Sequence, residues 1–259
     1  MRRARPPAVD DTVVWHDLEC GTYRGDLALW LELAASASGP VLDIGAGTGR
    51  VAVPLARAGH DVCALDCDHR LLAALRDRAA GLPVTCVHAD ACAFAPADGF
   101  GLCIVPMQTI HLLADRAGFL RCARAALRPG GLLAVALIGD GIEPFEMELE
   151  PDRAQRHGVL YESHPTALRL EGDTIVLERR RARIDPTGVR AHRDVIRLAP
   201  LAADELAAEA ARAGFIACGS RIVAPTDDRA GSVVLVMRRS ARGTRPRTAT
   251  PMASPGKIT

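Results

Sequence analysis

Apolar and polar residues alternate in blocks along the first half of the chain. Five short apolar runs have the length and composition of buried strands, at residues 40–44, 61–65, 83–88, 100–106 and 131–138. Segments with the helical spacing of apolar residues precede or separate these runs, at residues 26–35, 50–58, 68–80 and 115–127. Strands that alternate with helices at this spacing predict an α/β fold with a parallel, doubly wound sheet.

The pattern changes after residue 138. Residues 161–198 contain no good helical spacing and are typical of strands separated by the turn sequences EGD and DPTG, which are hairpin signals. Helical spacing returns at residues 203–213. Two further strands follow at residues 215–223 and 232–237, with a connection short enough for a hairpin. We therefore expect an antiparallel β insertion after the fifth strand and a hairpin at the end of the domain.

These patterns divide the chain into an N-terminal arm (1–22), an α/β domain (23–238) with an insertion at about 145–198, and a disordered basic tail (239–259). The net charge is +1, and subtracting the nine basic residues of the first seven and last twenty-two positions leaves −8 for the body. An acidic body argues against nucleic acid as a partner, because phosphate contacts require a basic face.

Membrane and secreted classes are also disfavoured. No apolar run approaches the ~20 residues of a membrane-spanning helix, and the basic start of the chain is followed by Asp10 and Asp11 instead of an apolar stretch. None of the eight cysteines forms a CxxC pair. We therefore expect free thiols and a cytoplasmic location.

The candidate chemistry lies where the first strand ends, in the sequence DIGAGTG at residues 43–49. Glycines there allow a tight turn and let a ligand lie directly against the peptide groups. Asp66 ends the second strand, where a carboxylate can accept two hydrogen bonds from a ribose diol, and Asp90 ends the third. Ligands of such sheets bind at the carboxyl ends of the strands, so these features predict a nucleoside site.

A nicotinamide dinucleotide is the first alternative ligand, and an oxidoreductase the alternative function. Its fingerprint, G-x-G-x-x-G, places Arg50 where the third glycine should be. The dinucleotide fingerprint does not include an acid two residues before its first glycine. Asp43 stands at that position, where it can bind a cationic amine. The spacing favours a nucleoside that carries an amino acid. A tight turn without any ligand is the remaining alternative.

Five segments, taken in order, resemble the motifs of class I S-adenosylmethionine (SAM)-dependent methyltransferases: VLDIGAGTGR, the acid Asp66, HADACAF, FGLCIVPMQTIHLL and LRPGGLLAVAL. The resemblance covers about residues 23–238. It implies a Rossmann-like sheet of seven strands whose last strand is antiparallel. It also implies SAM as the methyl donor and S-adenosylhomocysteine (SAH) as the product.

The resemblance further implies which residues surround the donor. Asp43 and Gly45 approach its amino-acid end, Asp66 approaches the ribose hydroxyls, and Asp90 with Ala91 borders the adenine. The whole implied set is Tyr23, Asp43, Gly45, Ala46, Gly47, Gly49, Asp66, Cys67, Asp90, Ala91, Pro106 and Met107.

Two members of that set resemble recurrent features of the family. Met107 resembles the apolar residue beside the donor, and Tyr23 resembles the aromatic residue that an N-terminal segment folds over it. One position departs from the family pattern. The fourth strand often begins with an aromatic residue followed by Asp, but here Phe100 is followed by Gly101. The missing Asp usually supports the loop, so donor binding is not put in doubt.

The acceptor is less well defined than the donor. Nucleic-acid amino-methyltransferases of this fold carry an Asn/Asp-Pro-Pro-aromatic run after the fourth strand, and residues 105–108 read VPMQ instead. A metal site would need a carboxylate cluster, of which only Asp140 and Glu143 are in place, so we predict none. We expect methyl transfer to an oxygen or nitrogen of a small molecule. A protein of the same fold that binds SAM without turnover, and a homodimer, stay open.

His111 is the candidate general base, because it follows the fourth strand and an imidazole titrates near neutral pH. The alternative is a packing or capping histidine at the start of a helical turn. His157, Tyr161 and His164 lie near the start of the inserted strands, where they either cover the acceptor or belong to the surface. The arginines of those strands are expected mainly on a solvated face.

Overall fold

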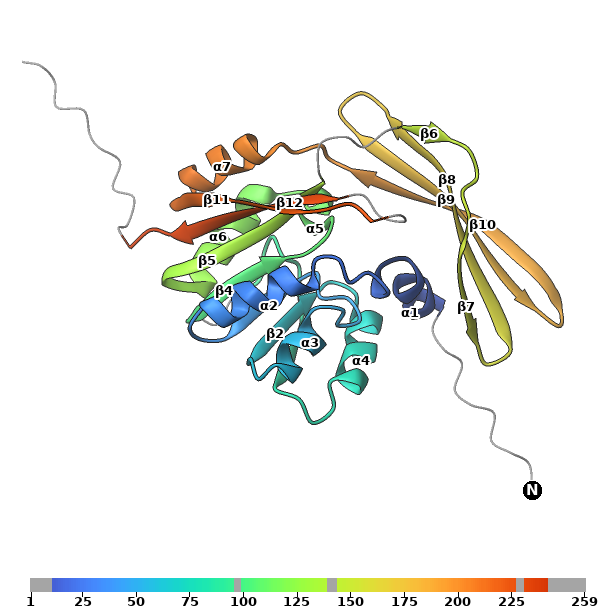
Figure 1. The fold of residues 1–259 in the computed structure, drawn as a ribbon, viewed down its shortest axis with the longest axis horizontal. Helices are drawn as coiled ribbons and strands as arrows, with labels where there is room; N and C mark the ends of the chain where they lie inside the picture. Colours follow the sequence, from blue (N-terminus) through green and yellow to red (C-terminus); the bar gives the residue numbers. More distant parts are fainter. Residues whose placement is uncertain (1–10, 96–98, 139–143, 227–230, 242–259) are drawn as a thin grey trace, which may run out of the picture.

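The structure is a computed structural model that describes residues 11–95, 99–138, 144–226 and 231–241 (Figure 1). Its main sheet contains seven strands in the order β11-β12-β5-β4-β1-β2-β3. The strands are β1 (Val41–Ile44), β2 (Val62–Asp66), β3 (Val84–His88), β4 (Phe100–Val105), β5 (Leu127–Ile138), β11 (Phe215–Val223) and β12 (Ser232–Arg239). The first five run parallel, and β12 is antiparallel to both β5 and β11. The predicted sheet and its terminal hairpin are therefore confirmed.

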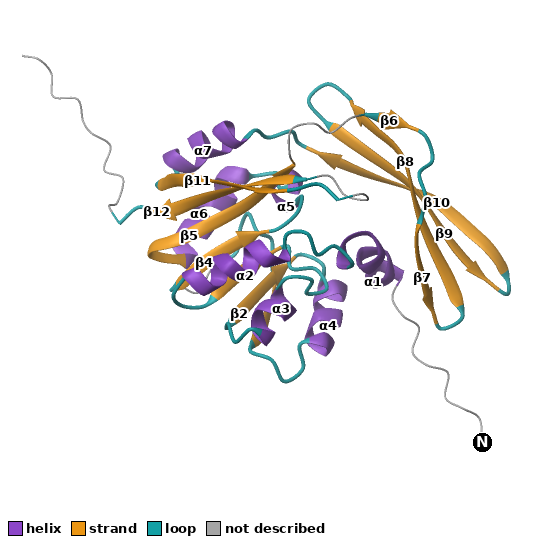
Figure 2. Cartoon of the chain, in the orientation of Figure 1, coloured by secondary structure: helices purple, strands orange, loops and turns teal. Residues whose placement is uncertain are grey.

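Helices cover both faces of this sheet (Figure 2). They are α2 (Leu27–Ser36), α3 (Ala52–Arg57), α4 (His69–Arg78), α5 (Thr109–Leu112), α6 (Arg116–Ala126) and α7 (Ala203–Arg212). One core cluster joins the sheet to α6 and α7 around Phe119 and Leu206, and a second joins it to α2, α3 and α4 around Trp30 and Leu72. This two-sided packing is the doubly wound arrangement expected from alternating strands and helices.

A second sheet stands beside the first, formed by the predicted insertion. Its strands are β6 (Phe145–Glu146), β7 (Asp152–Arg156), β8 (Val159–Leu170), β9 (Ile175–Asp185) and β10 (Gly188–Leu198), and every pairing is antiparallel. The expected turns lie between β8 and β9 and between β9 and β10. The β7–β8 hairpin was not expected. It turns at His157 and Gly158, both with positive φ (49° and 79°).

The described part of the predicted N-terminal arm is helical. It consists of α1 (Asp11–His16) and a π-helix, η1 (Asp17–Gly21). Val14, Trp15 and Leu18 are buried against Tyr161 of β8, so the segment lies between the main sheet and the inserted sheet (Figure 1). Below we call α1 and η1 together the N-terminal segment.

Two local features of the main domain depend on contacts between distant residues. Asp26 stands directly before α2, but its side chain does not cap that helix. It is instead buried and accepts two hydrogen bonds from Arg50, of 2.5 and 2.8 Å, because the guanidinium charge needs a buried counterion. The glycine at position 101, where the family pattern has Asp, has a steric explanation. A Cβ atom there would lie 1.9 Å from the Ser38 carbonyl oxygen, so the Asp of the family pattern has no room.

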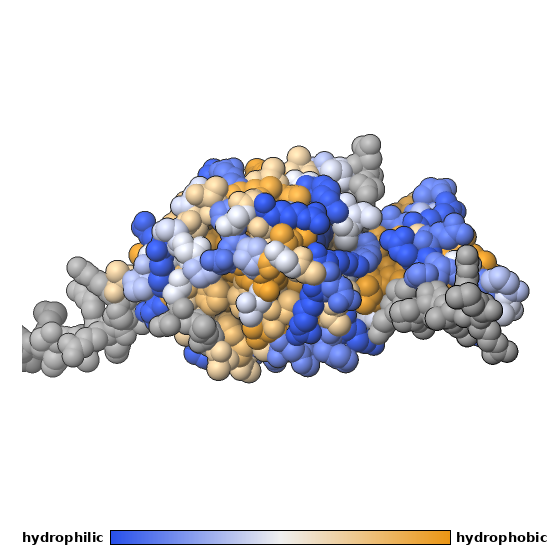
Figure 3. Space-filling model, turned by 90° about the horizontal axis from the view of Figure 1, so that it is seen from below, coloured by the Kyte–Doolittle hydropathy of each residue, from blue (hydrophilic) through white to orange (hydrophobic). Residues whose placement is uncertain are grey.

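The part of the inserted sheet that is visible in Figure 3 is largely hydrophilic. Ion pairs such as Glu178 with Arg193 and Glu162 with Arg153 join neighbouring strands. The expectation of a solvated, arginine-rich face is correct for Arg180, Arg193 and Arg197, but Arg179 and Arg181 are largely buried because they pair with Glu19. Among the helices of the described residues, none is long and apolar enough to cross a bilayer.

Candidate donor site and its cover

The glycine loop after β1 is held by the acid that ends β2. Asp66 accepts a 2.8 Å hydrogen bond from the Gly47 amide with Oδ2 and a 2.9 Å bond from the Asp68 amide with Oδ1. The amides of Gly45 and Ala46 donate to the Leu65 carbonyl, at 2.8 and 3.0 Å. A carboxylate has about four acceptor positions, so Asp66 keeps capacity for further donors such as ribose hydroxyls.

The three loop glycines have positive φ, of 70° at Gly45, 53° at Gly47 and 93° at Gly49. The loop also requires that Gly45 and Gly47 carry no side chain. A Cβ on Gly45 would lie 2.7 Å from the Thr109 side chain of α5, and one on Gly47 would lie 2.3 Å from the His16 ring of α1. Side chains from two other elements thus lie directly on this backbone. Gly45 remains exposed, whereas Gly47 is buried.

Asp43, in the middle of β1, is the most unusual charge in the site. Its side chain is 1% exposed, and neither oxygen has a hydrogen-bond partner among the described groups. Burial raises the pKa of its carboxyl to about 7, and the nearby Arg50 guanidinium only partly offsets this. An unpartnered buried acid suits a position beside a cationic ligand group, although the enclosed oxygens require the loop to open for direct contact.

Tyr23 lies at the end of the same network. The Arg50 guanidinium carbon is 5.3 Å from the centre of its ring, within the range of a cation–π interaction, and one Arg50 nitrogen also reaches the Tyr23 carbonyl at 3.3 Å. Since Arg50 follows Gly49 directly, Tyr23 is brought beside the glycine loop. The family resemblance implies an aromatic residue folded over the donor, and that contact of Tyr23 stays a prediction.

The other predicted donor residues stand at the carboxyl ends of neighbouring strands: Ala46 after β1, Cys67 after β2, Asp90 and Ala91 after β3, and Pro106 and Met107 after β4. Asp90 is exposed and accepts a 2.8 Å hydrogen bond from the Cys92 amide. Met107 has a φ of 55°, a strained value for a residue with a side chain, and such strain often occurs at functional sites. The fold brings the whole set to one edge of the sheet, and contact of each residue with a donor stays a prediction.

His16 is a site residue that the sequence reasoning missed. Its ring lies over Gly47, and Nδ1 is 3.3 Å from the Thr48 hydroxyl. Thr48 donates to Asp17 at 2.7 Å, and Arg78 of α4 also binds Asp17, with nitrogen–oxygen distances of 2.8 and 2.5 Å. Burial lowers the pKa of His16, so the ring beside the loop is neutral at neutral pH.

The N-terminal segment is fixed equally firmly to the inserted sheet. Glu19 of η1 accepts two 2.7 Å hydrogen bonds from Arg181 and one of 2.8 Å from Ser163. The Trp15 ring meets the Tyr161 ring edge-on at 5.1 Å, and the Tyr161 hydroxyl donates to Asp11 at 2.7 Å. The spacing of Val14, Trp15 and Leu18, one face of a helical turn, was the signal in the sequence.

His111 of α5 is 3% exposed and has a backbone partner on each ring nitrogen. Nδ1 is 2.8 Å from the Ala199 carbonyl oxygen, and the Ile138 amide donates to Nε2 at 3.0 Å. Neither nitrogen is directed at an open acceptor site. A catalytic base at His111 stays a prediction, and one of these hydrogen bonds would have to break for it to act.

The three residues near the start of the inserted strands do not converge on one site. Tyr161 points at the N-terminal segment, whereas His164 is paired with Glu148 at 2.9 Å and Glu162 at 3.4 Å. Alternate residues of a strand face opposite sides, so His164 points away from the N-terminal segment. His157 is exposed in the β7–β8 turn. His157 therefore fits the surface interpretation, whereas Tyr161 and His164 are buried and pack against neighbouring residues.

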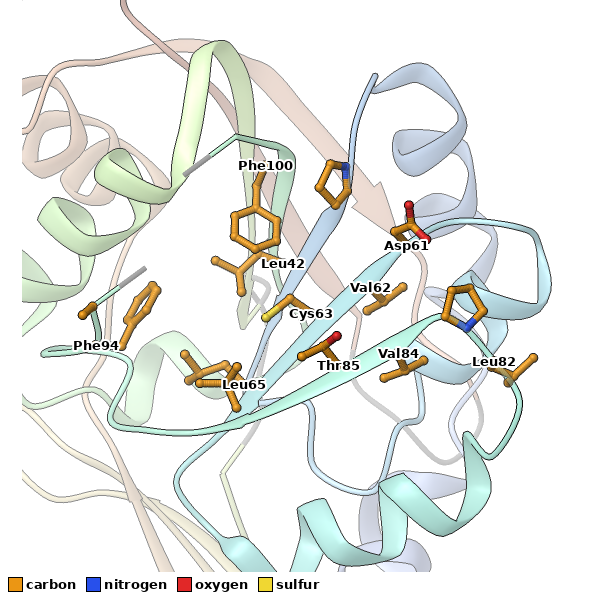
Figure 4. A pocket seen from close by; sticks show the side chains of 14 residues that line it. Leu42, Asp61, Val62, Cys63, Leu65, Leu82, Val84, Thr85, Phe94 and Phe100 are labelled. Atoms are coloured by element: carbon orange, nitrogen blue, oxygen red, sulfur yellow. The ribbon is translucent and has the colours of Figure 1, made fainter. Parts of the chain in front are cut away.

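A cavity of about 540 Å³ lies elsewhere, along the face of β1, β2 and β3. The side chains of Leu42, Cys63, Leu65 and Phe94 line it and point into a common space (Figure 4). None of the predicted donor residues lines this cavity, so it is separate from the candidate donor site. No cluster of potential metal ligands occurs in the residues that the structure describes. Asp140 and Glu143 lie outside them.

Comparison with known proteins, like the geometry of the site, indicates a methyltransferase. Residues 41–131 match a family model described as a methyltransferase domain. A ubiquinone biosynthesis O-methyltransferase of Methylocella silvestris is 34% identical over 111 residues, which are 40% of this chain and 42% of that protein. This chain therefore spans less than half the length of the curated relatives that it matches.

Solved structures extend the likeness over most of the chain. The glycopeptide N-methyltransferase MtfA in complex with SAH has a TM-score of 0.56 and 28% identity, covering 83% of this chain and 86% of that one. The sugar N-methyltransferase KedS8 from Streptoalloteichus has a TM-score of 0.70, covering 93% and 96%. At 20% identity it supports the fold alone. By sheet order, loop and matched domain, the chain is similar to class I SAM-dependent methyltransferases, and the domain match covers residues 41–131.

Proposed function

We propose that the protein transfers a methyl group from SAM to an oxygen or nitrogen atom of a small-molecule acceptor. The observation that carries the proposal is the glycine loop braced by Asp66 at the point where the sheet order reverses, between β1 and β4. Names of the relatives support both acceptor atoms, since they include an O-methyltransferase and an N-methyltransferase. A nicotinamide-dependent oxidoreductase receives no support from the matched family or these relatives.

SAM fits the residues present on two structural grounds. Asp43 is a buried carboxylate without a hydrogen-bond partner, and the donor carries an ammonium group. Gly45 offers exposed backbone with positive φ that a side chain would obstruct. In this proposal Asp66 and the loop hold the ribose and amino-acid parts, and Asp90, Met107 and Tyr23 complete the surroundings. Bound SAM would supply a methyl group on a positively charged sulfur, which makes the methyl electrophilic.

The protein's own contribution is then mainly positioning. In-line displacement needs the acceptor atom behind the methyl group, and correct orientation can supply much of the acceleration. The space between the carboxyl ends of β4 and β5 and the inserted sheet is where we place the acceptor. The inserted sheet and the N-terminal segment would exclude water from it. An acceptor that reacts in its neutral, lone-pair form needs no base at the moment of transfer.

Calorimetry with SAM, SAH and NAD tests the donor. We expect micromolar binding of SAM and SAH and no heat with NAD, and binding of NAD alone would refute the proposal. Turnover is then assayed by mass spectrometry with 3,4-dihydroxybenzoate as an oxygen acceptor and glucosamine as a nitrogen acceptor. A mass increase of one methyl group on either compound supports transfer. SAM binding without transfer to any of a wider panel of hydroxylated and amino compounds would support the binding protein without turnover.

A further inference from the structure

The inserted sheet is joined to the main domain at two points, and one side chain binds both. The chain leaves β5 at Ile138 and returns after β10 at Ala199. We call these two residues the junctions. The His111 ring accepts a hydrogen bond from the first junction at 3.0 Å and reaches the carbonyl of the second at 2.8 Å. A third bond, from the Ala199 amide to the His111 carbonyl, is 3.0 Å long.

The partners determine the protonation state of the ring. A carbonyl oxygen can only accept, so Nδ1 must carry the proton that it donates to Ala199. A backbone amide can only donate, so Nε2 must offer its lone pair to Ile138. His111 is therefore neutral, in a single tautomer, with both nitrogens engaged. A base for the acceptor would need the same lone pair that Ile138 occupies.

The same short helix also touches the donor loop. Thr109, two residues before His111, lies so close to Gly45 that a Cβ atom on that glycine would be 2.7 Å away. The hydroxyl of Thr109 donates to the Pro106 carbonyl at 3.0 Å, which fixes the start of α5. One turn of helix thus contacts the loop of the candidate donor site at one end and both junctions at the other.

We infer that His111 is a positioning residue that holds the inserted sheet in register with the donor loop, and is not the base of the reaction. This inference rests on the proposed function, because the register matters only if the sheet covers a methyl acceptor. Loss of the ring should let the junctions separate and the acceptor site widen. The donor site should be unaffected, since the ring makes none of the hydrogen bonds of the glycine loop.

Burial and one nearby positive charge keep the ring neutral. Burial lowers the pKa of His111, and Arg116 of α6 acts in the same direction. Arg116 is itself paired with Glu209 of α7, at 2.7 and 3.0 Å. The hydrogen bond to the Ala199 carbonyl favours the charged form and is the opposing influence. Protonation would place an N–H group against the Ile138 amide and remove one of the two junction bonds.

Two substitutions test the two hydrogen bonds of the His111 ring separately. In His111→Gln the amide oxygen can replace Nε2 as acceptor for Ile138, and in His111→Asn the amide nitrogen can replace Nδ1 as donor to Ala199. His157→Asn, at an exposed turn position with positive φ that Asn tolerates, is the matched control. We expect hydrogen–deuterium exchange at the Ile138 amide to accelerate at least tenfold in His111→Asn. Exchange there should stay near the wild-type rate in His111→Gln and in the control. An unchanged rate in His111→Asn overturns the inference.

Calorimetry and kinetics distinguish a positioning role of His111 from a general loss of structure, because they measure donor binding and acceptor binding separately. We expect the Kd for SAM to change by less than threefold in both variants. For whichever of 3,4-dihydroxybenzoate or glucosamine is methylated, KM should rise about tenfold in His111→Asn and less in His111→Gln. If the turnover rate instead falls at least about 100-fold in both variants while KM is unchanged, His111 is the base. If the wild type binds no SAM, the proposed function fails, while the exchange experiment still decides whether His111 holds the junctions.

Discussion

Glu19 and Arg181 are joined by two hydrogen bonds of 2.7 Å in a bidentate pair, although 162 positions separate them in the chain. The Glu19 side chain is 6% exposed and that of Arg181 18%. Arg179 adds a third contact, at 3.3 Å. The arginines hold the pKa of Glu19 below its usual range, even though burial acts to raise it. This pair is the main polar connection between the N-terminal segment and the inserted sheet.

Replacing Glu19 with Gln should destabilise the protein. The substitution leaves two arginine charges largely buried without their shared counterion, and breaking a buried pair typically costs about 3–5 kcal/mol. We expect the lower end of that range in urea unfolding, because Asp194 also contacts Arg181, at 2.8 Å. Glu32→Gln is the control, since its pair with Arg221 is exposed and 3.6 Å long. A loss at Glu19 no larger than at Glu32, where we expect under ~0.5 kcal/mol, would contradict the role of the pair.

Asp43 should give the protein an unusual dependence of stability on pH. Its pKa is about 7 in the folded state against 3.8 for an ordinary Asp, so between those values the folded protein holds a proton that the unfolded chain has released. The contribution of Asp43 to the free energy of unfolding therefore falls as pH rises from about 4 to 7, and is constant above that. His16 and His111 have lowered pKa values and act in the opposite direction. Their contribution to the free energy of unfolding falls as pH falls below 6.5.

Asp43→Asn isolates this contribution. We expect the unfolding free energy of the variant, relative to wild type, to increase by about 3 kcal/mol between pH 4.5 and pH 8, since one pKa unit is worth about 1.4 kcal/mol. Urea unfolding at several pH values measures it. The change with pH is the test, because an uncharged amide alters the absolute stability at every pH. Parallel curves for the two proteins would show that Asp43 is ionised throughout.

The same acid should couple SAM binding to proton release. If the donor's ammonium group compensates Asp43, binding lowers the pKa of that carboxyl and expels its proton. At pH 6.5 we expect the calorimetric heat of SAM binding to differ between phosphate and Tris buffers, whose ionisation enthalpies differ. The difference should correspond to release of about half a proton or more. Asp43→Asn should bind with the same heat in both buffers. Equal heats for the wild-type protein would place the ammonium group elsewhere.

Asp66→Ala should weaken SAM binding by about 1.5–3 kcal/mol, the usual range for hydrogen bonds to a charged group. The structure adds a second effect, because Asp66 also accepts the Gly47 amide and so fixes the loop. We therefore expect a lower melting temperature as well. Asp61→Ala, at an exposed position before β2, should change neither quantity. Unchanged SAM affinity in Asp66→Ala would remove this residue from the donor site.

The sequence predicts the main domain well because its signals are local. Each parallel strand is a short apolar run bounded by turn residues, and the positive φ values at Gly45, Gly47 and Gly49 follow from the glycines themselves. The positions of Asp66 and Asp90 follow from the rule that parallel strands end at one edge. The hairpins from β8 to β10 were likewise predictable from EGD and DPTG.

The missed features depend on contacts between distant parts of the chain. Nothing near Asp26 shows that Arg50 will bind it, and nothing near His111 shows that Ile138 and Ala199 will occupy its ring. The N-terminal segment was assigned to an arm because it is short and precedes the first clear helix. The spacing of Val14, Trp15 and Leu18 indicates a helical face, but no local pattern shows that Tyr161 will cover it.

That dependence has a consequence for how the chain matures on the ribosome. The N-terminal segment leaves the ribosome long before its partners Tyr161, Arg179 and Arg181, which emerge only after most of the main sheet has been synthesised. Contacts so far apart in the chain form late, because closing a long loop carries an entropic cost before any contact compensates it. Trp15 and Leu18 therefore stay without their final apolar neighbours during much of translation. The residue that lies on the glycine loop, His16, reaches its place together with them. The nascent protein should thus form the parallel part of its sheet before its donor site is complete, and the N-terminal segment should be among the last parts to settle.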